Sequence, residues 1–228
     1  LSNARGGLFE WAKENKVIND IIHQTSKYSL DCENIAQVNT VKGIQTFIKD
    51  GYGKPYIPGS SIKGAIRNVL LSQSIEKDTN SNDEVISALR KPDAGDNNIM
   101  SGIKIADSKP LSFSNLTLCQ KIDAKLDGDP SELPIFRECI KPETKIEFNL
   151  TIDTSLFKKS ISYIEEAVEN FLNNYNEEFL LKFKEENPYY GNVIYLGGGA
   201  GYHTKTVTSS LLKNERDKVK IIGNIINN

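Results

Sequence analysis

Apolar residues recur every three or four positions in three stretches of the chain, the spacing typical of helices that bury one face. These stretches cover residues 8–22, 62–71 and 161–186. In the last of them, the pair Asn173-Asn174 can divide the pattern into two helices. Trp11 lies in the first stretch, where its helical context favours packing against the core over stacking on a ligand.

Other stretches are rich in β-branched and aromatic residues or alternate between apolar and polar side chains, which predicts strands. They are residues 36–49, 103–108, 116–122, 145–152 and, as a short buried strand, 193–196. Between them we expect a turn at 50–55 and a loop at 121–132, because Gly, Pro and Asp gather there. Helices and strands mixed along the chain in this way predict an α+β fold.

The composition limits what the chain can do. No apolar run approaches the length that crosses a bilayer. A formal net charge of −2 over 228 residues argues against binding of nucleic acid by the whole surface, so an RNA site would be a local basic track. Three widely spaced cysteines form no zinc or redox motif, so we expect reduced cysteines in a cytoplasmic protein without metal or cofactor. Residues 1–4 resemble the remnant of a removed tag and are left out of fold reasoning.

The first chemically informative segment is Tyr56-Ile-Pro-Gly-Ser-Ser-Ile-Lys-Gly-Ala-Ile-Arg with the apolar residues that follow it. Proline and glycine end an extended stretch, and either serine can cap a helix that starts there. The helix start supplies N–H donors and positive potential, while a lysine and an arginine four residues apart add full charges on one face. Such a site suits phosphate. Its expected contributors are Lys54 from the preceding turn, Ser60, Ser61, Lys63 and Arg67.

Taken alone, the same basic residues are also consistent with an ordinary solvated helix face, since exposure is the default for charged side chains. The segment is not a nucleotide-binding P-loop. In that motif a lysine follows the glycine and precedes a hydroxyl residue, whereas here Lys63 precedes Gly64.

The second informative segment is Gly197-Gly-Gly-Ala-Gly-Tyr-His-Thr-Lys-Thr, directly after the short strand. A run of glycines lets the main chain approach a ligand closely, the tyrosine can stack on a base, and the histidine and lysine can meet phosphate. It is not a dinucleotide fingerprint, because a tyrosine stands where that fold needs a small residue. A glycine turn without a ligand is the plain alternative. The candidate RNA contacts here are Gly197, Gly198, Gly199, Gly201, Tyr202, His203 and Lys205.

The first segment resembles the signature helix of the RAMP superfamily of CRISPR proteins. The order Ala106-Asp-Ser, a strand, Arg137-Glu-Cys-Ile-Lys-Pro-Glu-Thr and a second strand resembles the middle of one RAMP family, the Csm five subunits of type III-A CRISPR effector complexes. The segment Leu196-Gly-Gly-Gly-Ala-Gly-Tyr-His-Thr-Lys-Thr-Val resembles the glycine-rich loop of the same family. These segments follow the family's order.

This resemblance implies a ferredoxin-like fold related to the RNA recognition motif, in two packed parts at residues 5–150 and 151–228, the second with the glycine-rich loop. It implies that guide RNA (crRNA) lies across that loop and the signature helix. It further implies a non-catalytic subunit that caps the 3′ end of the guide and supports crRNA maturation in antiviral defence. The implied protein partners are the adjacent backbone RAMP subunit, the small subunit and a recruited trimming nuclease; no membrane is implied.

Two other functions remain open. A metal-independent endoribonuclease that processes precursor crRNA would need a general base and acid, for which His203 with Tyr202 is the credible pair, His23 lying alone in a polar loop. Asp107 could be catalytic or hold a metal, although a lone aspartate after a strand more often caps a turn. A protein–protein adaptor is the third interpretation, which the glycine-rich loop disfavours because protein interfaces seldom need such close approach of the main chain.

Overall fold

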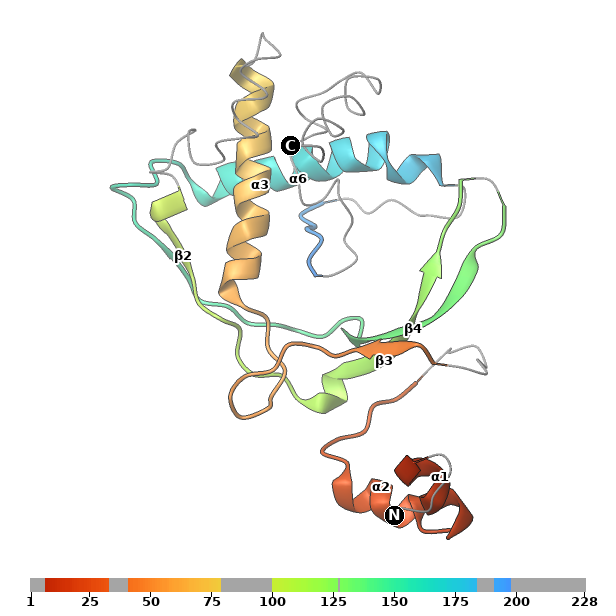
Figure 1. Ribbon diagram of the computed structural model, residues 1–228. Coiled ribbons are helices and arrows are strands. Elements are labelled where there is room, and N and C mark those ends of the chain that lie inside the picture. Colours follow the sequence, from red (N-terminus) through yellow and green to blue (C-terminus); the bar gives the residue numbers. More distant parts are fainter. Residues whose placement is uncertain (1–6, 33–40, 79–99, 127, 184–190, 198–228) are drawn as a thin grey trace, which may run out of the picture. The chain divides into compact units, whose positions relative to one another are not determined.

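The computed structural model describes residues 7–32, 41–78, 100–126, 128–183 and 191–197 (Figure 1). Within these residues the helices are α1 (Gly7–Glu14), α2 (Ile18–Thr25), α3 (Gly59–Asp78) and α6 (Ile161–Glu178), with short 3₁₀ turns η1 (Phe113–Asn115) and η2 (Leu180–Lys182). The strands are β1 (Gly43–Gln45), β2 (Ile103–Ile105), β3 (Leu116–Asp123), β4 (Ser131–Ile140) and β5 (Leu150–Ile152). The predicted α+β class is confirmed.

The chain forms two compact units, each assembled from separate stretches of sequence. Unit 1 takes residues 1–55, 111–121 and 133–144, and unit 2 takes residues 56–110, 122–132 and 145–228. The predicted division into ferredoxin-like parts at 5–150 and 151–228 stays a prediction.

Unit 1 is built on a three-stranded sheet with the order β1-β4-β3. β1 runs parallel to β4, with Ile44 opposite Phe136. As the central strand, β4 buries the ring of Phe136, which is 2% exposed. Other buried apolar side chains among the described residues of this unit are Ala12, Pro55, Leu111 and Leu116.

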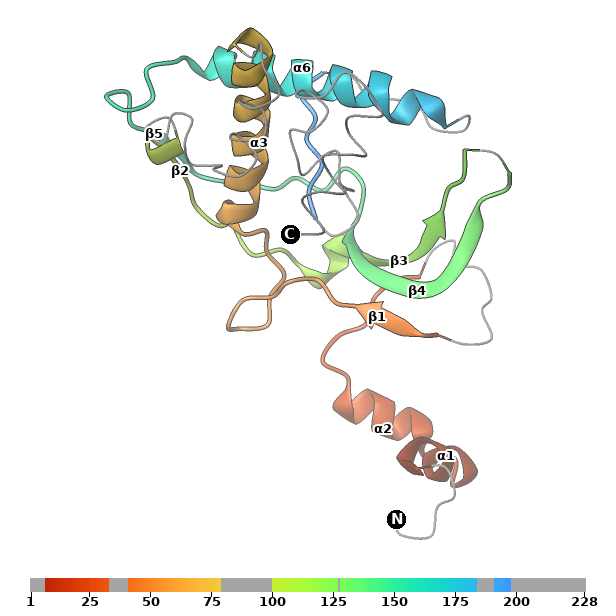
Figure 2. The same ribbon diagram turned by 45° about the horizontal axis from the view of Figure 1, so that its top comes forward.

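Unit 2 is built on the two long helices α3 and α6, which pack against each other (Figures 1 and 2). β2 and β5 pair antiparallel, with Lys104 opposite Thr151. The apolar residues of both helices recur at helical spacing, so each helix turns one face inward. The resulting core consists of Val69, Leu70, Ile103, Phe157, Ile164, Ala167 and Val168. Burial of this apolar surface is the main force that holds unit 2 together.

Two predicted helices differ from the structure. The pattern over residues 8–22 forms two helices, α1 and α2, and Lys16 between them adopts a left-handed φ of 56°. The predicted break at Asn173-Asn174 is wrong. Leu172 and Tyr175 are buried on either side of it and hold the helix intact, so α6 continues to Glu178.

The predicted strands 36–49 and 145–152 are too long. Among the described residues of the first, only β1 is a strand, because the N–H of Phe47 bonds to the side chain of Glu138 and not to a neighbouring strand. In the second, only Leu150–Ile152 form a strand with β2. Beyond it, the N–H groups of Ala106 and Lys109 still bond to the carbonyls of Asn149 and Glu147, while that of Ser108 bonds to Ile57. The predicted loop 121–132 is shorter than expected, since β3 and β4 both extend into it, and residues 193–196 form no strand.

The three cysteines, Cys32, Cys119 and Cys139, are free thiols in the structure. No helix in the described part of the chain has the length and hydrophobicity that a membrane span requires.

Candidate nucleic-acid interface

The start of α3 differs from the predicted serine cap. The helix begins at Gly59, whose backbone N–H donates to Oδ1 of Asp107 at 2.8 Å. Ser60 and Ser61 are exposed residues within the first turn, so neither of them caps the helix. Asp107 thus places a negative charge where a phosphate was expected, and it caps a helix, whereas the sequence favoured the cap of a turn.

Gly59 is required here by close packing. A Cβ at this position would lie closer than 3.0 Å to the backbone oxygens of Ile105 and Ala106. The neighbouring Ser108 is 6% exposed and completes the contact, because its Oγ accepts from the N–H of Ile57 at 2.9 Å. The start of α3 is therefore held against the residues that end β2 by hydrogen bonds to the side chains of Asp107 and Ser108 and by close packing of Gly59 on the backbone.

Lys63 and Arg67 lie one turn apart on α3, as predicted, and both side chains are partly buried. Ala65 and Val69, which stand two residues away from them, line a small pocket against α6. Residues two apart on a helix point to roughly opposite sides. The two basic side chains therefore lie on the side of α3 that faces away from this pocket.

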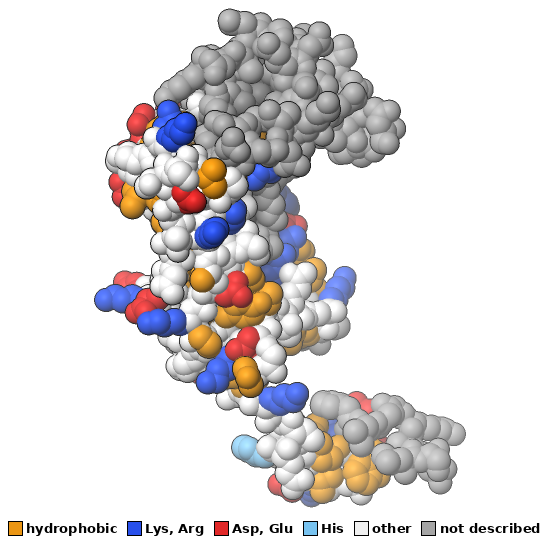
Figure 3. Space-filling model, turned by 90° about the vertical axis from the view of Figure 1, so that its left-hand side faces the viewer, with side chains coloured by type: hydrophobic (Ala, Val, Ile, Leu, Met, Phe, Trp, Pro, Cys, Tyr) orange, Lys and Arg blue, Asp and Glu red, His pale blue; other side chains and the backbone are white. Residues whose placement is uncertain are grey.

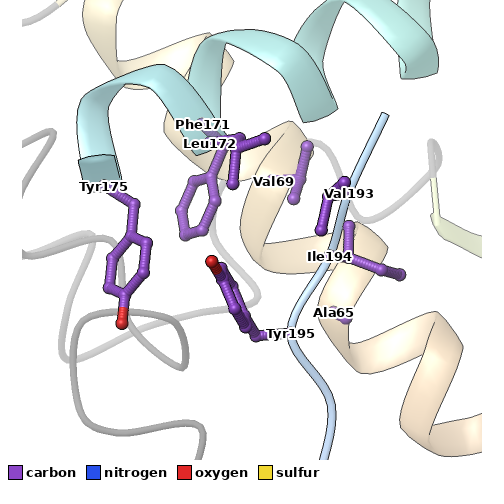
Figure 4. Close-up of a pocket in the computed structure, with 8 residues that line it drawn as sticks. All are labelled: Ala65, Val69, Phe171, Leu172, Tyr175, Val193, Ile194 and Tyr195. Atoms are coloured by element: carbon purple, nitrogen blue, oxygen red, sulfur yellow. The ribbon is translucent and has the colours of Figure 1, made fainter. Parts of the chain in front are cut away.

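The residues just before the glycine-rich loop pack into the same pocket. Figure 4 shows Val193, Ile194 and Tyr195 beside Ala65 and Val69 of α3 and beside three residues of α6. The ring of Tyr195 lies 5.1 Å from that of Tyr175, centroid to centroid. Segments about 130 residues apart in the sequence (compare Ala65 with Ile194) are thus brought together in unit 2.

Gly197, two residues after Tyr195, is the first residue of the glycine-rich loop and has a φ of 92°, which favours glycine. The other predicted contacts of the loop, Gly198, Gly199, Gly201, Tyr202, His203 and Lys205, lie outside the described residues.

Lys54 belongs to unit 1, and the other contributors to the predicted phosphate site belong to unit 2. Lys54 is exposed and ends a tight turn whose first residue, Asp50, accepts hydrogen bonds from the N–H groups of Tyr52 and Lys54 at 2.9 and 2.8 Å. Composition correctly predicted this turn.

A buried charge network supports the base of the turn. Glu138, 8% exposed, accepts hydrogen bonds from Tyr28 Oη at 2.6 Å, and from Lys49 Nζ and the Phe47 N–H at 2.7 Å each. Burial by itself would raise the pKa of Glu138, but the bonds from Lys49, Tyr28 and Phe47 outweigh it and lower the pKa. Burial likewise opposes the charge of Lys49, whose pKa is nevertheless raised by Glu138 and Tyr28. No signal in the local sequence points to this network, because its members are about 110 residues apart (Tyr28 and Glu138).

Basic and acidic side chains are interspersed on the face shown in Figure 3. The local basic track expected for an RNA site stays a prediction. In the described part of the chain, no group of three or more His, Cys, Asp or Glu side chains is arranged to hold a metal ion.

A sequence model of the RAMP superfamily matches residues 13–202. The chain therefore belongs to the RAMP superfamily. Within it, the chain is similar to proteins named CRISPR system Cms protein Csm5. It is 32% identical to the one from Mycobacterium tuberculosis, 33% to the one from Streptococcus thermophilus and 29% to the one from Enterococcus italicus. The resemblance predicted from the sequence is thereby confirmed.

These alignments cover 73%, 76% and 78% of this chain and 53%, 53% and 50% of the three relatives. The chain thus spans about half the length of the curated relatives it matches.

Two solved structures share the fold. One is described as a cryo-EM structure of the Csm–crRNA–target RNA ternary complex of a type III-A CRISPR-Cas system; the matching chain has a TM-score of 0.62 at 20% identity, over 92% of this chain and 74% of that one. The other is the crystal structure of T. onnurineus Csm5, with a TM-score of 0.61 at 18% identity, over 96% and 81% of the two chains.

Proposed function

We propose that this chain is the part of a type III-A Csm effector subunit that binds the guide RNA. The observation that carries the proposal is its similarity to Csm5 proteins of three bacterial species over about three quarters of its length. The likeness in fold to a chain of a complex that contains crRNA supports it. The partners of such a subunit are crRNA and the other subunits of the complex, namely the adjacent backbone RAMP subunit and the small subunit.

The finer role that we propose is structural. The subunit caps the 3′ end of the guide and supports crRNA maturation, with a trimming nuclease recruited for the cutting, and it has no catalytic site of its own. Its place of action is the cytoplasm.

Binding would rest on charge and on backbone access. Lys54, Lys63 and Arg67 supply cations for phosphates, and the glycines from Gly197 to Gly201 let the RNA backbone come close, while Tyr202 stacks on a base. Because Asp107 occupies the start of α3, the phosphates are held by the basic side chains and not by the helix terminus. Ser60 and Ser61 are exposed on the first turn of α3, the helix that carries Lys63 and Arg67, and can add hydroxyl donors.

The test is the binding of labelled single-stranded RNA at several salt concentrations by the wild type and by the double variant Lys63→Ala, Arg67→Ala. We expect weaker binding to every RNA sequence, with the slope of log affinity against log salt reduced by about 0.7 for each phosphate that the variant no longer neutralises. The matched control is Lys104→Ala, Lys158→Ala, which removes two exposed charges from the same unit. An equal weakening in the control variant would show that only net charge matters.

An unchanged salt slope in the double variant would remove Lys63 and Arg67 from the site. Incubation with and without Mg²⁺ separates the structural role from a nuclease. Intact RNA in both cases supports the proposal, whereas RNA shortened by the wild type but not by His203→Ala would replace it with the endoribonuclease.

A further inference from the structure

The side chain of Tyr52 stands at the tip of the turn 50–54 in unit 1 and is 94% exposed. A tyrosine normally buries most of its ring, because the apolar face gains free energy on leaving water. Among the exposed hydrophobic side chains of the described residues, the next most exposed are Ile122, Ile161 and Leu181, each at 56%. Tyr52 thus stands out from the scattered apolar groups of an ordinary surface.

The turn that carries Tyr52 is fixed at both ends. At its base, Lys49 pairs with Pro55 in an antiparallel bridge; Lys49 is bound by the buried Glu138, and Pro55 is itself buried. Within it, the carboxylate of Asp50 accepts the N–H groups of Tyr52 and Lys54, and the backbone of Asp50 bonds to both Lys54 and Gly53 at 2.9 Å. The ring is therefore presented from an ordered backbone, which lowers the entropic cost of binding a ligand.

Both neighbours of Tyr52 are glycines. Gly53 has a φ of 79°, which explains a glycine there, but a Cβ at Gly51 would meet no atom within 4 Å and no positive φ requires it. Among the described residues the protein offers no packing reason for Gly51, and neither position that flanks Tyr52 carries a side chain. An exposed ring and an exposed cation on one turn, here Tyr52 and Lys54, are the two groups with which proteins hold single-stranded nucleic acid by stacking and charge.

We propose that Tyr52 is a stacking platform for one unpaired base of the bound RNA, with Lys54 contacting the adjacent phosphate. This inference rests on the proposed RNA-binding function and adds a contact from unit 1 to the contacts on α3 and the glycine-rich loop. A protein partner is the poorer match. Hot spots of protein interfaces lie within packed apolar surroundings, whereas both neighbours of this ring are glycines without a packing contact.

The test compares the wild type with Tyr52→Ala, Tyr52→Phe and Lys54→Ala in binding single-stranded RNA and an abasic oligomer of the same length. We expect Tyr52→Ala to bind RNA about 5- to 150-fold more weakly, as measured for the removal of a stacking side chain. Its salt slope stays unchanged because no charge is removed, whereas Lys54→Ala lowers the slope. Tyr52→Phe retains the affinity, and the abasic oligomer binds wild type and Tyr52→Ala equally.

Fluorescence gives a direct readout, because the chain has one tryptophan, Trp11. In a Trp11→Phe background, Tyr52→Trp places the sole indole on the turn, and its emission should be quenched by RNA and not by the abasic oligomer.

If the wild type binds RNA with a normal salt slope but Tyr52→Ala binds equally well, the inference falls and the proposed function stands. If the wild type binds no RNA, both fall. An RNA affinity that is unchanged while association with another subunit disappears would assign Tyr52 to a protein contact instead.

Discussion

Gly59 and Asp107 are joined by a 2.8 Å hydrogen bond between the N–H that starts α3 and a carboxylate that follows β2. They belong to two different segments through which the chain resembles its family, the signature helix and the Ala-Asp-Ser segment. The two motifs therefore support each other: one provides the helix and the other provides its cap.

Asp107→Ala should destabilise unit 2. The loss of a capping carboxylate typically costs about 0.5–2 kcal/mol of unfolding free energy. Urea unfolding followed by circular dichroism measures it, with Asp129→Ala, an exposed aspartate of the β3–β4 connection, as control. Equal stability of the two variants would contradict the assigned cap.

Two glycines of α3 should respond to alanine in opposite directions. Gly59→Ala pushes a Cβ into the backbone at Ile105 and Ala106, and we expect a loss of about 1–3 kcal/mol, as for overpacked cores. Gly64→Ala meets no atom within 4 Å and should gain roughly 0.5–1 kcal/mol from the higher helix propensity of alanine. The same unfolding measurement decides the matter, and a stable Gly59→Ala protein would refute the close approach.

Two glutamates test how burial changes the contribution of an ion pair to the free energy of unfolding. Glu138→Gln breaks a network in which the side chains of Glu138 and Lys49 are 5% and 19% exposed, and we expect a loss of about 2–3 kcal/mol, somewhat below that of a fully buried pair. Glu147→Gln breaks the ion pair with Lys109. The side chains of Glu147 and Lys109 are 69% and 77% exposed, so water screens the pair and the substitution should leave stability essentially unchanged. Similar effects in both variants would contradict the distinction.

The stability of unit 1 should depend on acid through Glu138. Its pKa in the folded protein lies below the ordinary value of 4.5, so the carboxylate contributes stability at and above that pH, and the contribution is lost as pH falls through the folded pKa. The difference in unfolding free energy between wild type and Glu138→Gln should therefore shrink between pH 7 and about pH 3. A difference that stays constant over this range would show that Glu138 is not ionised in the fold.

Local sequence signals predicted much of the architecture. The helical spacing of Val69 and Leu70, and of Ala167 and Val168, follows directly from burial of one face and correctly placed α3 and α6. The turn at 50–54 was also predicted, because its glycines and aspartate have only local roles.

The parts that were missed depend on distant partners. From the sequence alone, a serine is a plausible cap for α3. In the structure the N–H of Gly59 is instead capped by Asp107, 48 residues further along the chain. Phe47 reads as a strand residue, but its N–H is bound by Glu138, 91 residues away. The contact of Tyr195 with α3 and α6, which places the start of the glycine-rich loop, likewise arises only from tertiary packing.

The interleaving of the two units has a consequence for synthesis on the ribosome. Unit 1 takes its last stretch from residues 133–144, so its first residues cannot find the central strand β4 until that stretch has been translated. Until then β1 is exposed without the strand it pairs with. No contiguous fragment that ends before residue 144 therefore contains a complete unit 1, and a nascent chain of that length presents β1 as an unpaired edge.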